Sequence, residues 1–337
     1  MSTIRPRPQT NQYKDIEHPF AKYVRIVGKG KRGSRSLTFE EAVDAFGQIL
    51  DGEVLDTQLG AFLMLLRVKE ESVDELAGFV TATRERLTLP ALSVDLDWSS
   101  YAGKRRHYPW FLLAALTLAK SGVRVFMHGA AGHTMNRLYT EDVLPVLGFP
   151  ACQSVDDVTK ALNEYNFAFL PLSVLSPKLS ELIDLRNVMG LRSPVHTLAR
   201  LINPFNATVT LQAIFHPAYR TSHQQTALRL GYQNAAVIKG EGGEFERNPD
   251  ARTLVLGIKD GLGYETEWDM LNEARSDVEE TFNLNEFVSV WQGKTKHEYG
   301  EKAVVGTLAL TLVALKKTDS MDDAMLMAQK LWDGRLC

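Results

Sequence analysis

The chain has 337 residues, 45% of them hydrophobic, so it can hold one large domain or two ordinary ones and bury a core, which excludes a disordered or fibrous protein. Its two cysteines, Cys152 and Cys337, exclude a disulfide framework or a cysteine-based metal site, and the polar, basic N-terminus lacks an apolar signal region. The net charge is −3 and no apolar stretch is long enough to span a bilayer, so we expect a cytoplasmic protein with no membrane partner.

Residues 1–36 differ from the rest of the chain in charge. They contain nine Lys/Arg and two acidic residues, a local balance of +7 that leaves −10 on the other 301 residues. Because Pro, Gly, Lys and Arg dominate this segment, its composition predicts a basic extended arm. Such an arm creates a positive potential on an acidic body, which suits a polyanion; the alternative is a solvated, partly disordered leader.

A small helical domain is predicted over residues 37–90. Capping boxes that begin at Thr38 and Ser72 predict the first and third helices, because each places a side-chain acceptor at the N-cap and a Glu three residues later. The helix between them, about 58–69, is apolar almost all round, which indicates burial in a bundle or an interface. So small a subdomain cannot bury that helix completely, and we therefore expect a homodimer. Helices at about 176–203 are expected to join the same domain.

Short strand-like runs alternate with helical patterns over residues 91–337. The runs, rich in Val, Leu, Ile and Phe, are 92–98, 123–128, 166–172, 209–215, 235–239 and 253–258. The helical patterns lie at about 110–121, 136–147, 176–189, 193–202, 218–230, 303–316 and 321–332. This alternation predicts an α/β fold, with a large domain built on a mainly parallel sheet covered on both faces. Ligands of such sheets bind outside the carboxyl ends of the strands, which directs attention to the loops after Trp98, His128 and Lys239.

The loop after the first strand combines cations with aromatic side chains. The cations are Lys104, Arg105 and Arg106, and the aromatic residues are Tyr101, Tyr108 and Trp110. Cations interleaved with aromatic rings suit a phosphodiester strand whose bases can stack. The alternative is a solvated basic turn with the aromatic residues packed beneath it. With Gly103 as its only glycine, the loop is a weak phosphate cradle.

The other two loops are less specific. His128 and His133 flank a glycine turn, but no acidic or Cys partner has metal-ligand spacing, so a structural role is expected for both. The loop after Lys239 contains glycines and three carboxylates, Glu241, Glu244 and Glu246. These could hold Mg²⁺, and the alternative is a solvent-exposed acidic turn. The sequence contains no P-loop, dinucleotide fingerprint or nucleophile elbow.

Taken in order, several segments resemble anthranilate phosphoribosyltransferase. They are Gly52-Glu53-Val54, Leu59–Lys69, Glu75–Phe79, His128-Gly129, Asp142–Gly148, Arg186–Arg192 and Leu201–Pro204. The resemblance covers about residues 37–333. It implies a small helical domain, a large α/β domain and a dimer formed through the helical domain. Pyrimidine nucleoside phosphorylases share this fold, so the fold alone does not name the reaction.

The resemblance also implies that the ligand motifs of that family have changed. The Gly-Thr-Gly-Gly-Asp pyrophosphate loop falls on Ser100–Lys104, and the Lys-His-Gly-Asn-Arg motif falls on Met127–Ala131. The Asp-Glu pair that holds Mg²⁺ falls on Phe245-Glu246, which leaves Glu246 as a remnant. Phosphoribosyl transfer needs metal and cations to stabilise the departing pyrophosphate, so we expect no catalytic residue, metal or cofactor. The residues expected to line a residual ligand cleft are Ser100, Tyr101, Gly103, His128, Gly129 and Arg192.

This pattern is similar to the branch of the family typified by YbiB, which the resemblance implies to be dimeric, non-catalytic and nucleic-acid-binding without sequence preference. We therefore predict a non-catalytic homodimer that binds nucleic acid, in single-stranded form. The predicted contacts are Lys29, Lys31, Arg32, Arg35, Lys104, Arg105, Arg106, Arg192, His196 and Arg200; the last three, four residues apart, share one face if the segment is helical. The alternative is an active phosphoribosyltransferase or other glycosyltransferase with an altered substrate and Mg²⁺, in which the three consecutive cations replace the missing phosphate ligands.

Overall fold

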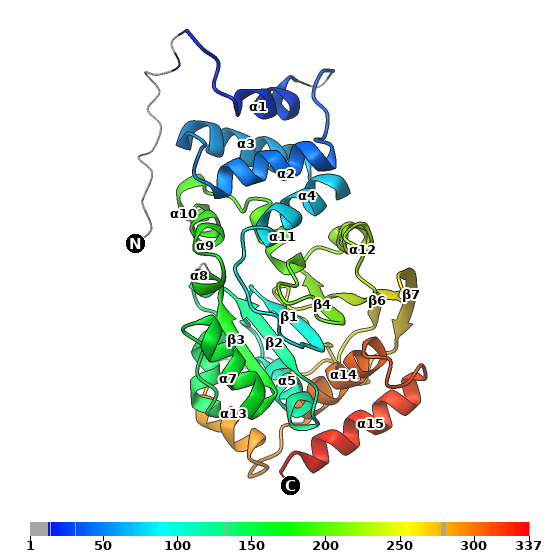
Figure 1. Cartoon of the computed structure of the whole chain (residues 1–337). Coiled ribbons are helices and arrows are strands. Elements are labelled where there is room, and N and C mark those ends of the chain that lie inside the picture. Colours follow the sequence, from blue (N-terminus) through cyan, green and yellow to red (C-terminus); the bar gives the residue numbers. More distant parts are fainter. Residues whose placement is uncertain (1–12, 14, 31, 133, 278–280, 337) are drawn as a thin grey trace. The chain divides into compact units, whose positions relative to one another are not determined.

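The structure, a computed structural model, describes residues 13, 15–30, 32–132, 134–277 and 281–336. It divides into two compact units, each of which is built from two separate stretches of sequence. The helical unit comprises the chain up to Thr88 together with Ser176–Ile202, and the α/β unit comprises Leu89–Leu175 and the chain from Asn203 onwards. Figure 1 labels the elements of both units.

The helical unit begins its main helices where the sequence places their caps. Its elements are α1 (Ala21–Gly28), α2 (Phe39–Leu50), α3 (Asp56–Lys69), α4 (Val73–Arg84), α9 (Pro177–Asp184), α10 (Arg186–Met189), α11 (Val195–Leu198) and the 3-10 turn η3 (Ala199–Leu201). The side chains of Thr38 and Ser72 accept hydrogen bonds from the backbone of Glu41 and Glu75, each at 3.2 Å, so both predicted capping boxes are confirmed.

Part of the segment that composition predicted to be an extended arm is a helix. In and just before α1, the buried side chains Phe20, Tyr23 and Val27 recur at helical spacing. The ring of Phe20 packs edge-on against that of Phe62 in α3, with centroids 5.1 Å apart. A wholly extended arm over residues 1–36 is therefore wrong, because these apolar residues anchor α1 within the helical unit.

The α/β unit is built on a seven-stranded sheet with the order β3-β2-β1-β4-β5-β6-β7. Its strands are β1 (Leu96–Ser100), β2 (Val125–Gly129), β3 (Phe167–Pro171), β4 (Val209–Ile214), β5 (Asn234–Lys239), β6 (Thr253–Lys259) and β7 (Leu262–Trp268). The first five are parallel, and β6 and β7 extend the sheet as an antiparallel hairpin. A helical domain joined to a larger α/β domain with a mainly parallel sheet is thus confirmed.

Helices cover both faces of this sheet. The helical elements of this unit are α5 (Trp110–Lys120), α6 (Thr140–Val143), η2 (Leu144–Leu147), α7 (Val155–Tyr165), α8 (Leu172–Leu175), α12 (Tyr219–Arg229), α13 (Leu284–Trp291), α14 (Glu298–Ala314), α15 (Met321–Asp333) and η4 (Gly334–Leu336). The main core packs α5 and α14 against alternate residues of the sheet, among them Trp98 and Met127, while α12 covers the other face near Val237. Within the described residues, no helix is both long enough and apolar enough to cross a membrane.

Candidate functional site

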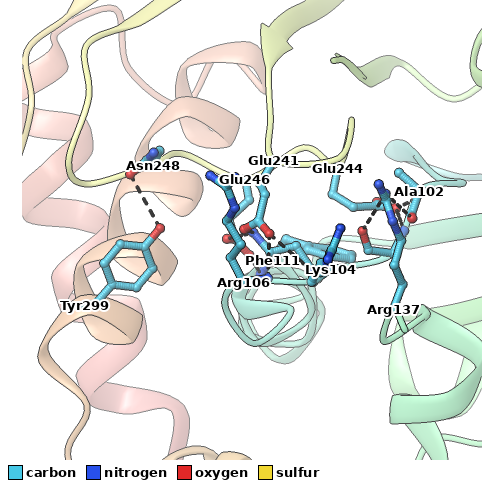
Figure 2. A network of polar contacts seen from close by, with 12 residues as sticks. Ala102, Lys104, Arg106, Phe111, Arg137, Glu241, Glu244, Glu246, Asn248 and Tyr299 are labelled. Atoms are coloured by element: carbon cyan, nitrogen blue, oxygen red, sulfur yellow. Dashed lines mark hydrogen bonds and ion pairs between the residues drawn. The ribbon is translucent and has the colours of Figure 1, made fainter. Parts of the chain in front are cut away.

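Three loops that follow parallel strands come together in the α/β unit. We refer to residues 101–109 as the β1 loop, 130–139 as the β2 loop and 240–252 as the β5 loop. The backbones of Lys104 and Leu138 exchange two hydrogen bonds of 2.8 Å, which join the β1 loop to the β2 loop. The β5 loop reaches the β1 loop through carboxylate side chains (Figure 2). The parallel sheet therefore brings together the loops that the sequence singled out.

Glu244 occupies the tight turn at the start of the β1 loop. Its Oε1 accepts hydrogen bonds from the backbone N–H groups of Ala102, at 2.5 Å, and Gly103, at 2.7 Å. Gly103 has a φ of +65°, the left-handed conformation that lets two successive N–H groups converge on one acceptor. The side chain of Glu244 is completely buried. The turn is thus built to bind an anion, and a carboxylate of the same chain fills it.

Two further carboxylates of the β5 loop hold the rest of the β1 loop. Oε1 of Glu241 accepts hydrogen bonds from the backbone N–H groups of Arg106, at 2.8 Å, and Arg105, at 3.3 Å. Oε2 of Glu246 accepts one from the backbone of Phe111, at 2.8 Å, in the first turn of α5. A carboxylate at a helix N-terminus is stabilised by the helix dipole and by an N–H group that has no partner within the helix.

Lys104 lies between these two carboxylates (Figure 2). Its side chain is only 1% exposed, and its Nζ is 2.6 Å from Oε1 of Glu246 and 2.8 Å from Oε2 of Glu241. Burial by itself lowers the pKa of Lys104, but the two carboxylates outweigh it and the pKa is raised. Burial likewise opposes the charge of Glu241, yet the ammonium of Lys104 holds the pKa of that carboxyl below its ordinary value. The cation is therefore charged and is used to hold two loops together.

The expectation that Lys104 and neighbouring rings contact nucleic acid is wrong, because these side chains are buried. Tyr101, Tyr108 and Trp110 are at most 2% exposed. The ring of Tyr108 stacks on that of Phe287, and Trp110 packs against the same ring, so neither is available to stack on a base. Of the predicted contacts in this loop, Arg105 and Arg106 are exposed.

Three of the residues expected to line a residual cleft, Ser100, Tyr101 and His128, make buried polar contacts. The hydroxyl of Tyr101 is 2.7 Å from Nδ1 of His128, whose Nε2 is 3.4 Å from Oδ1 of Asp97 in β1. The hydroxyl of Ser100 bonds to that of Thr140 at 2.7 Å. His128 thus has a structural setting, as its lack of metal-ligand spacing suggested, whereas His133 lies outside the described residues.

A glycine fixes the close approach of the first two strands at this network. A Cβ built on Gly129 would lie 1.9 Å from the carbonyl oxygen of Ser100, so any larger residue would push β1 and β2 apart. Of the cleft residues, the structure brings together Ser100, Tyr101, Gly103, His128 and Gly129 in the α/β unit. The sixth, Arg192, belongs to the helical unit.

The nucleic-acid contacts predicted near the N-terminus differ in exposure and in whether an acidic side chain already pairs with them. Lys29 and Arg32 are exposed. Arg35 is exposed too, but its guanidinium forms a bidentate pair with Glu41, at 2.6 and 2.7 Å. This pairing lowers the pKa of Glu41 to about 2. Lys31 lies outside the described residues.

The segment that carries Arg192, His196 and Arg200 is not a single helix. Gly190 ends α10 in a left-handed conformation, and α11 begins only at Val195, so Arg192 precedes the helix. His196 is 8% exposed, and the guanidinium of Arg200 donates to the carbonyl oxygen of His196. The expectation of three side chains on one accessible helical face is therefore wrong, because the i, i+4 relation does not include Arg192.

Sequence reasoning missed two groups that shape the site. It described Glu244 as part of a metal-binding or solvent-exposed turn, whereas the structure buries it inside the β1 loop. It did not consider Arg137 of the β2 loop, whose Nη1 donates to the carbonyl oxygens of Ala102, at 2.8 Å, and Gly103, at 3.4 Å. The only signal in the sequence was the spacing of three Glu among glycines, which allows a loop to wrap closely around a neighbour.

The residues at the position of the implied Mg²⁺ pair do not fit a metal ion. Phe245 is apolar and completely buried. Both oxygens of Glu246 are engaged, one by the ammonium of Lys104 and the other by the backbone of Phe111. A hard divalent cation needs several oxygen ligands, and a cation already occupies this position.

A helical unit made from two chain segments and an α/β unit with a mainly parallel sheet form the architecture that the sequence resemblance implied. The chain matches the helical bundle domain of the glycosyl transferase family over residues 24–87 and the α/β domain of that family over residues 111–334, and it therefore belongs to this family.

Two relatives and a solved structure illustrate its position. The chain is 29% identical over 265 residues to the uncharacterized protein YbiB of Escherichia coli K12. This alignment covers 77% of this chain and 82% of YbiB. It is 28% identical over 323 residues to anthranilate phosphoribosyltransferase of Methylocella silvestris, spanning 92% of this chain and 91% of that one. It is similar to the crystal structure of anthranilate phosphoribosyltransferase from Thermus thermophilus, with a TM-score of 0.78 at 22% identity over 95% of this chain and 96% of that one. The anthranilate phosphoribosyltransferase-like fold is thus confirmed.

Proposed function

We propose that this chain is a dimeric protein that binds single-stranded nucleic acid through exposed cations and does not transfer phosphoribosyl groups. The observation that supports the absence of phosphoribosyl transfer is the occupied turn of the β1 loop. The N–H groups of Ala102 and Gly103 already bind Glu244, and the ammonium of Lys104 already binds two carboxylates. Donors that are used within the chain cannot also stabilise a departing pyrophosphate.

The exposed cations support the proposal that the chain binds nucleic acid. Residues 1–36 carry a charge of +7 on a chain of net charge −3. Within the described residues Lys29 and Arg32 of this segment are exposed, and so are Arg105 and Arg106 beside the occupied turn. Backbone contacts from cations of this kind give affinity without base preference, because phosphates carry no sequence information.

The surface of α3 supports a dimer. Val68 is 82% exposed, Ala61 is exposed and Met64 is half-buried, and these residues follow the spacing of one helical face. An apolar face of this kind is stabilised by burial against a symmetric copy of itself. We expect V68E to shift sedimentation at micromolar concentration from dimer to monomer, and a wild-type chain that sediments as a monomer would remove the dimer from the proposal.

The test of nucleic-acid binding is the salt dependence of oligonucleotide affinity. If four cations per chain neutralise phosphates, log K should fall with log[salt] at a slope of about −3 on single strands, measured by fluorescence anisotropy. The variant R105A/R106A should make that slope shallower by about 1.4 and weaken oligo-dT and mixed sequences alike. The control K294A/K296A removes two exposed lysines from the same unit and should leave the slope unchanged. Binding that is insensitive to salt and to the R105A/R106A change contradicts the proposal.

The kinship with a protein named anthranilate phosphoribosyltransferase favours a second candidate, an active transferase with an altered substrate. This candidate predicts release of pyrophosphate from phosphoribosyl pyrophosphate with Mg²⁺ and an acceptor. It also predicts that R192A abolishes that release. We expect no release above the rate without protein, and substrate-dependent release lost in R192A would establish the transferase instead.

A further inference from the structure

Phe215 presents an aromatic ring at the surface of the α/β unit, directly after strand β4. The residue is 50% exposed. Among the Phe, Tyr and Trp side chains that the structure describes, only those of Phe215 and Tyr165 are exposed. The ring of Phe215 meets that of His216 at 84°, with centroids 4.8 Å apart. Because the two rings are nearly perpendicular, His216 leaves at least one face of the Phe215 ring uncovered.

The place of Phe215 in the sheet brings it close to the β1 and β5 loops. Strand β4 lies between β1 and β5, and all three are parallel, so their carboxyl ends share one edge. The backbone N–H of Gly240 donates to the carbonyl oxygen of Ile214, the residue before Phe215, at 3.1 Å. The next residue, Glu241, accepts from the backbone of Arg106 at 2.8 Å. Because consecutive Cα atoms are about 3.8 Å apart, a single step along the β5 loop links the strand that ends at the ring to the loop of Arg106.

Exposed cations lie on both sides of strand β4. Lys239 is the last residue of β5 and is in register with the last residue of β4. Its side chain is exposed, as are those of Arg105 and Arg106 in the β1 loop. The carboxylate of Glu241, which lies in the loop between them, is 2.8 Å from the ammonium of Lys104 and is therefore already neutralised. Phe215 thus stands among cations that can contact phosphates.

Tyr165, the other exposed ring, has an acidic setting. It is the last residue of α7 and comes just before β3, which places it toward the amino end of the sheet. A hydrogen bond to the carboxylate of Glu164 raises the pKa of Tyr165. A negative group beside a ring repels a phosphodiester strand. Exposure alone therefore does not make a ring suitable for nucleic acid, and Tyr165 is a matched control for Phe215.

We propose, on the basis of the proposed function, that Phe215 is the residue that stacks on an unpaired base while Lys239, Arg105 and Arg106 contact the neighbouring phosphates. The exposed ring takes the role that the buried rings of the β1 loop cannot fill. Every base has a flat face, so stacking of this kind is tolerant of sequence. Phe215 also supplies a preference for single strands that cations alone do not give, because the bases of a duplex are already stacked and paired.

The decisive variant is F215A, titrated with oligo-dT by fluorescence anisotropy. Loss of one stacked base should weaken binding by about 5- to 150-fold. An abasic strand of the same length has the phosphates without the bases, so F215A should bind it as the wild type does, with the same salt slope. The control Y165A removes the other exposed ring of the same unit and should bind oligo-dT as tightly as the wild type.

A second variant, F215L, separates stacking from a structural role. Leucine keeps an apolar side chain at this position but has no flat ring, so F215L should fold and still bind oligo-dT as weakly as F215A. Circular dichroism and thermal unfolding check the fold of each variant, and F215L carries the test if F215A fails to fold. F215W keeps a flat ring and should bind oligo-dT at least as tightly as the wild type.

A loss of affinity in F215A and F215L that is confined to oligo-dT supports the proposal. It is overturned if folded F215L binds oligo-dT as tightly as the wild type. It is also overturned if F215L loses affinity for the abasic strand to the same extent, since Phe215 then does not act on a base. The proposed function fails separately, when R105A/R106A leaves the salt slope unchanged. A wild-type protein that binds no oligonucleotide overturns both.

Discussion

Lys104 of the α/β unit and Arg35 of the helical unit were both expected to meet a phosphate backbone, and both bind carboxylates instead. The side chains of Lys104 and Glu246 are 1% and 2% exposed, and a second carboxylate, that of Glu241, completes the cluster. The side chains of Arg35 and Glu41 are 53% and 27% exposed. The same chemical pairing therefore occurs once inside the protein and once at its surface.

Solvent decides what each pair contributes. Water screens the Arg35–Glu41 pair, so its contribution to the free energy of unfolding is small although the contact is bidentate. Lys104 has no water to replace its partners, and the loss of either partner leaves a charge that is costly to bury. The number of cations in a sequence therefore does not give the number available to a ligand.

The largest effect is expected from K104A. This change leaves Glu241 and Glu246 facing each other without a cation, and we expect a loss of about 3–5 kcal/mol in the free energy of unfolding, measured by urea denaturation. The neighbouring R105A, at an exposed position, should change it by less than about 0.5 kcal/mol. Equal effects of the two substitutions would contradict the distinction between buried and exposed cations.

A double variant sharpens this prediction by removing the repulsion. E241Q keeps the oxygen that accepts from the backbone of Arg106 and removes one charge, so K104A/E241Q should be more stable than K104A by about 1–2 kcal/mol. The raised pKa of Lys104 means that the contribution of its charge is fully present below the ordinary lysine pKa and is lost as pH rises through the folded value. The cost of K104A should therefore be constant between about pH 7 and 9.

An intermediate effect is expected for Glu75 of the helical unit. This buried carboxylate accepts hydrogen bonds from the backbones of Leu37, at 2.9 Å, and Ser72, at 2.7 Å, and from the half-buried Lys69, at 2.7 Å. E75A leaves two backbone donors without this acceptor, and we expect a loss of about 2–3 kcal/mol in urea denaturation. Because water can reach Lys69, the loss should be smaller than for K104A. A larger loss for E75A than for K104A would contradict the claim that burial sets the cost of losing a charged partner.

The smallest effect is expected for R35A, with a loss of about 0–1 kcal/mol at pH 7. Arg35 holds the pKa of Glu41 at about 2, below its ordinary value of 4.5, so the pair contributes above pH 4.5 and is lost as pH falls toward 2. Wild type and R35A should therefore become equally stable near pH 2. Thermal unfolding of both proteins between pH 7 and pH 2 measures whether their stabilities converge. If R35A is still less stable than the wild type at pH 2, the effect of the substitution comes from another contact.

The sequence predicted the fold well wherever the pattern was strong. The capping boxes gave the starts of α2 and α4 to within a residue, and the apolar runs predicted β1 to β6. It missed β7 because Leu262–Trp268 alternates Glu with Tyr and Thr on an edge strand, so its hydrophobic signal is weak. It missed α7, whose apolar stripe rests on few residues, and α1, whose apolar residues stand among cations.

The site was harder to predict than the fold for a physical reason. The order of strands indicated which loops would hold the site, because parallel strands end at the same edge. Whether Lys104 would be exposed depended on Glu246, which is 142 positions further along the chain. No local pattern carries information about a partner at that distance. The same holds for Glu244 and the turn that it fills.

Titration calorimetry with phosphoribosyl pyrophosphate and Mg²⁺ tests whether this chain has lost the ligand site that the resemblance implies, because its N–H groups at Ala102 and Gly103 and its ammonium at Lys104 already bind carboxylates. We expect no saturable heat for the wild-type protein at millimolar ligand, while oligonucleotide binding is retained in the same preparation. Stoichiometric binding of phosphoribosyl pyrophosphate, accompanied by a shift of the Gly103 amide, would contradict this expectation, because Glu244 would then have yielded the turn to the ligand.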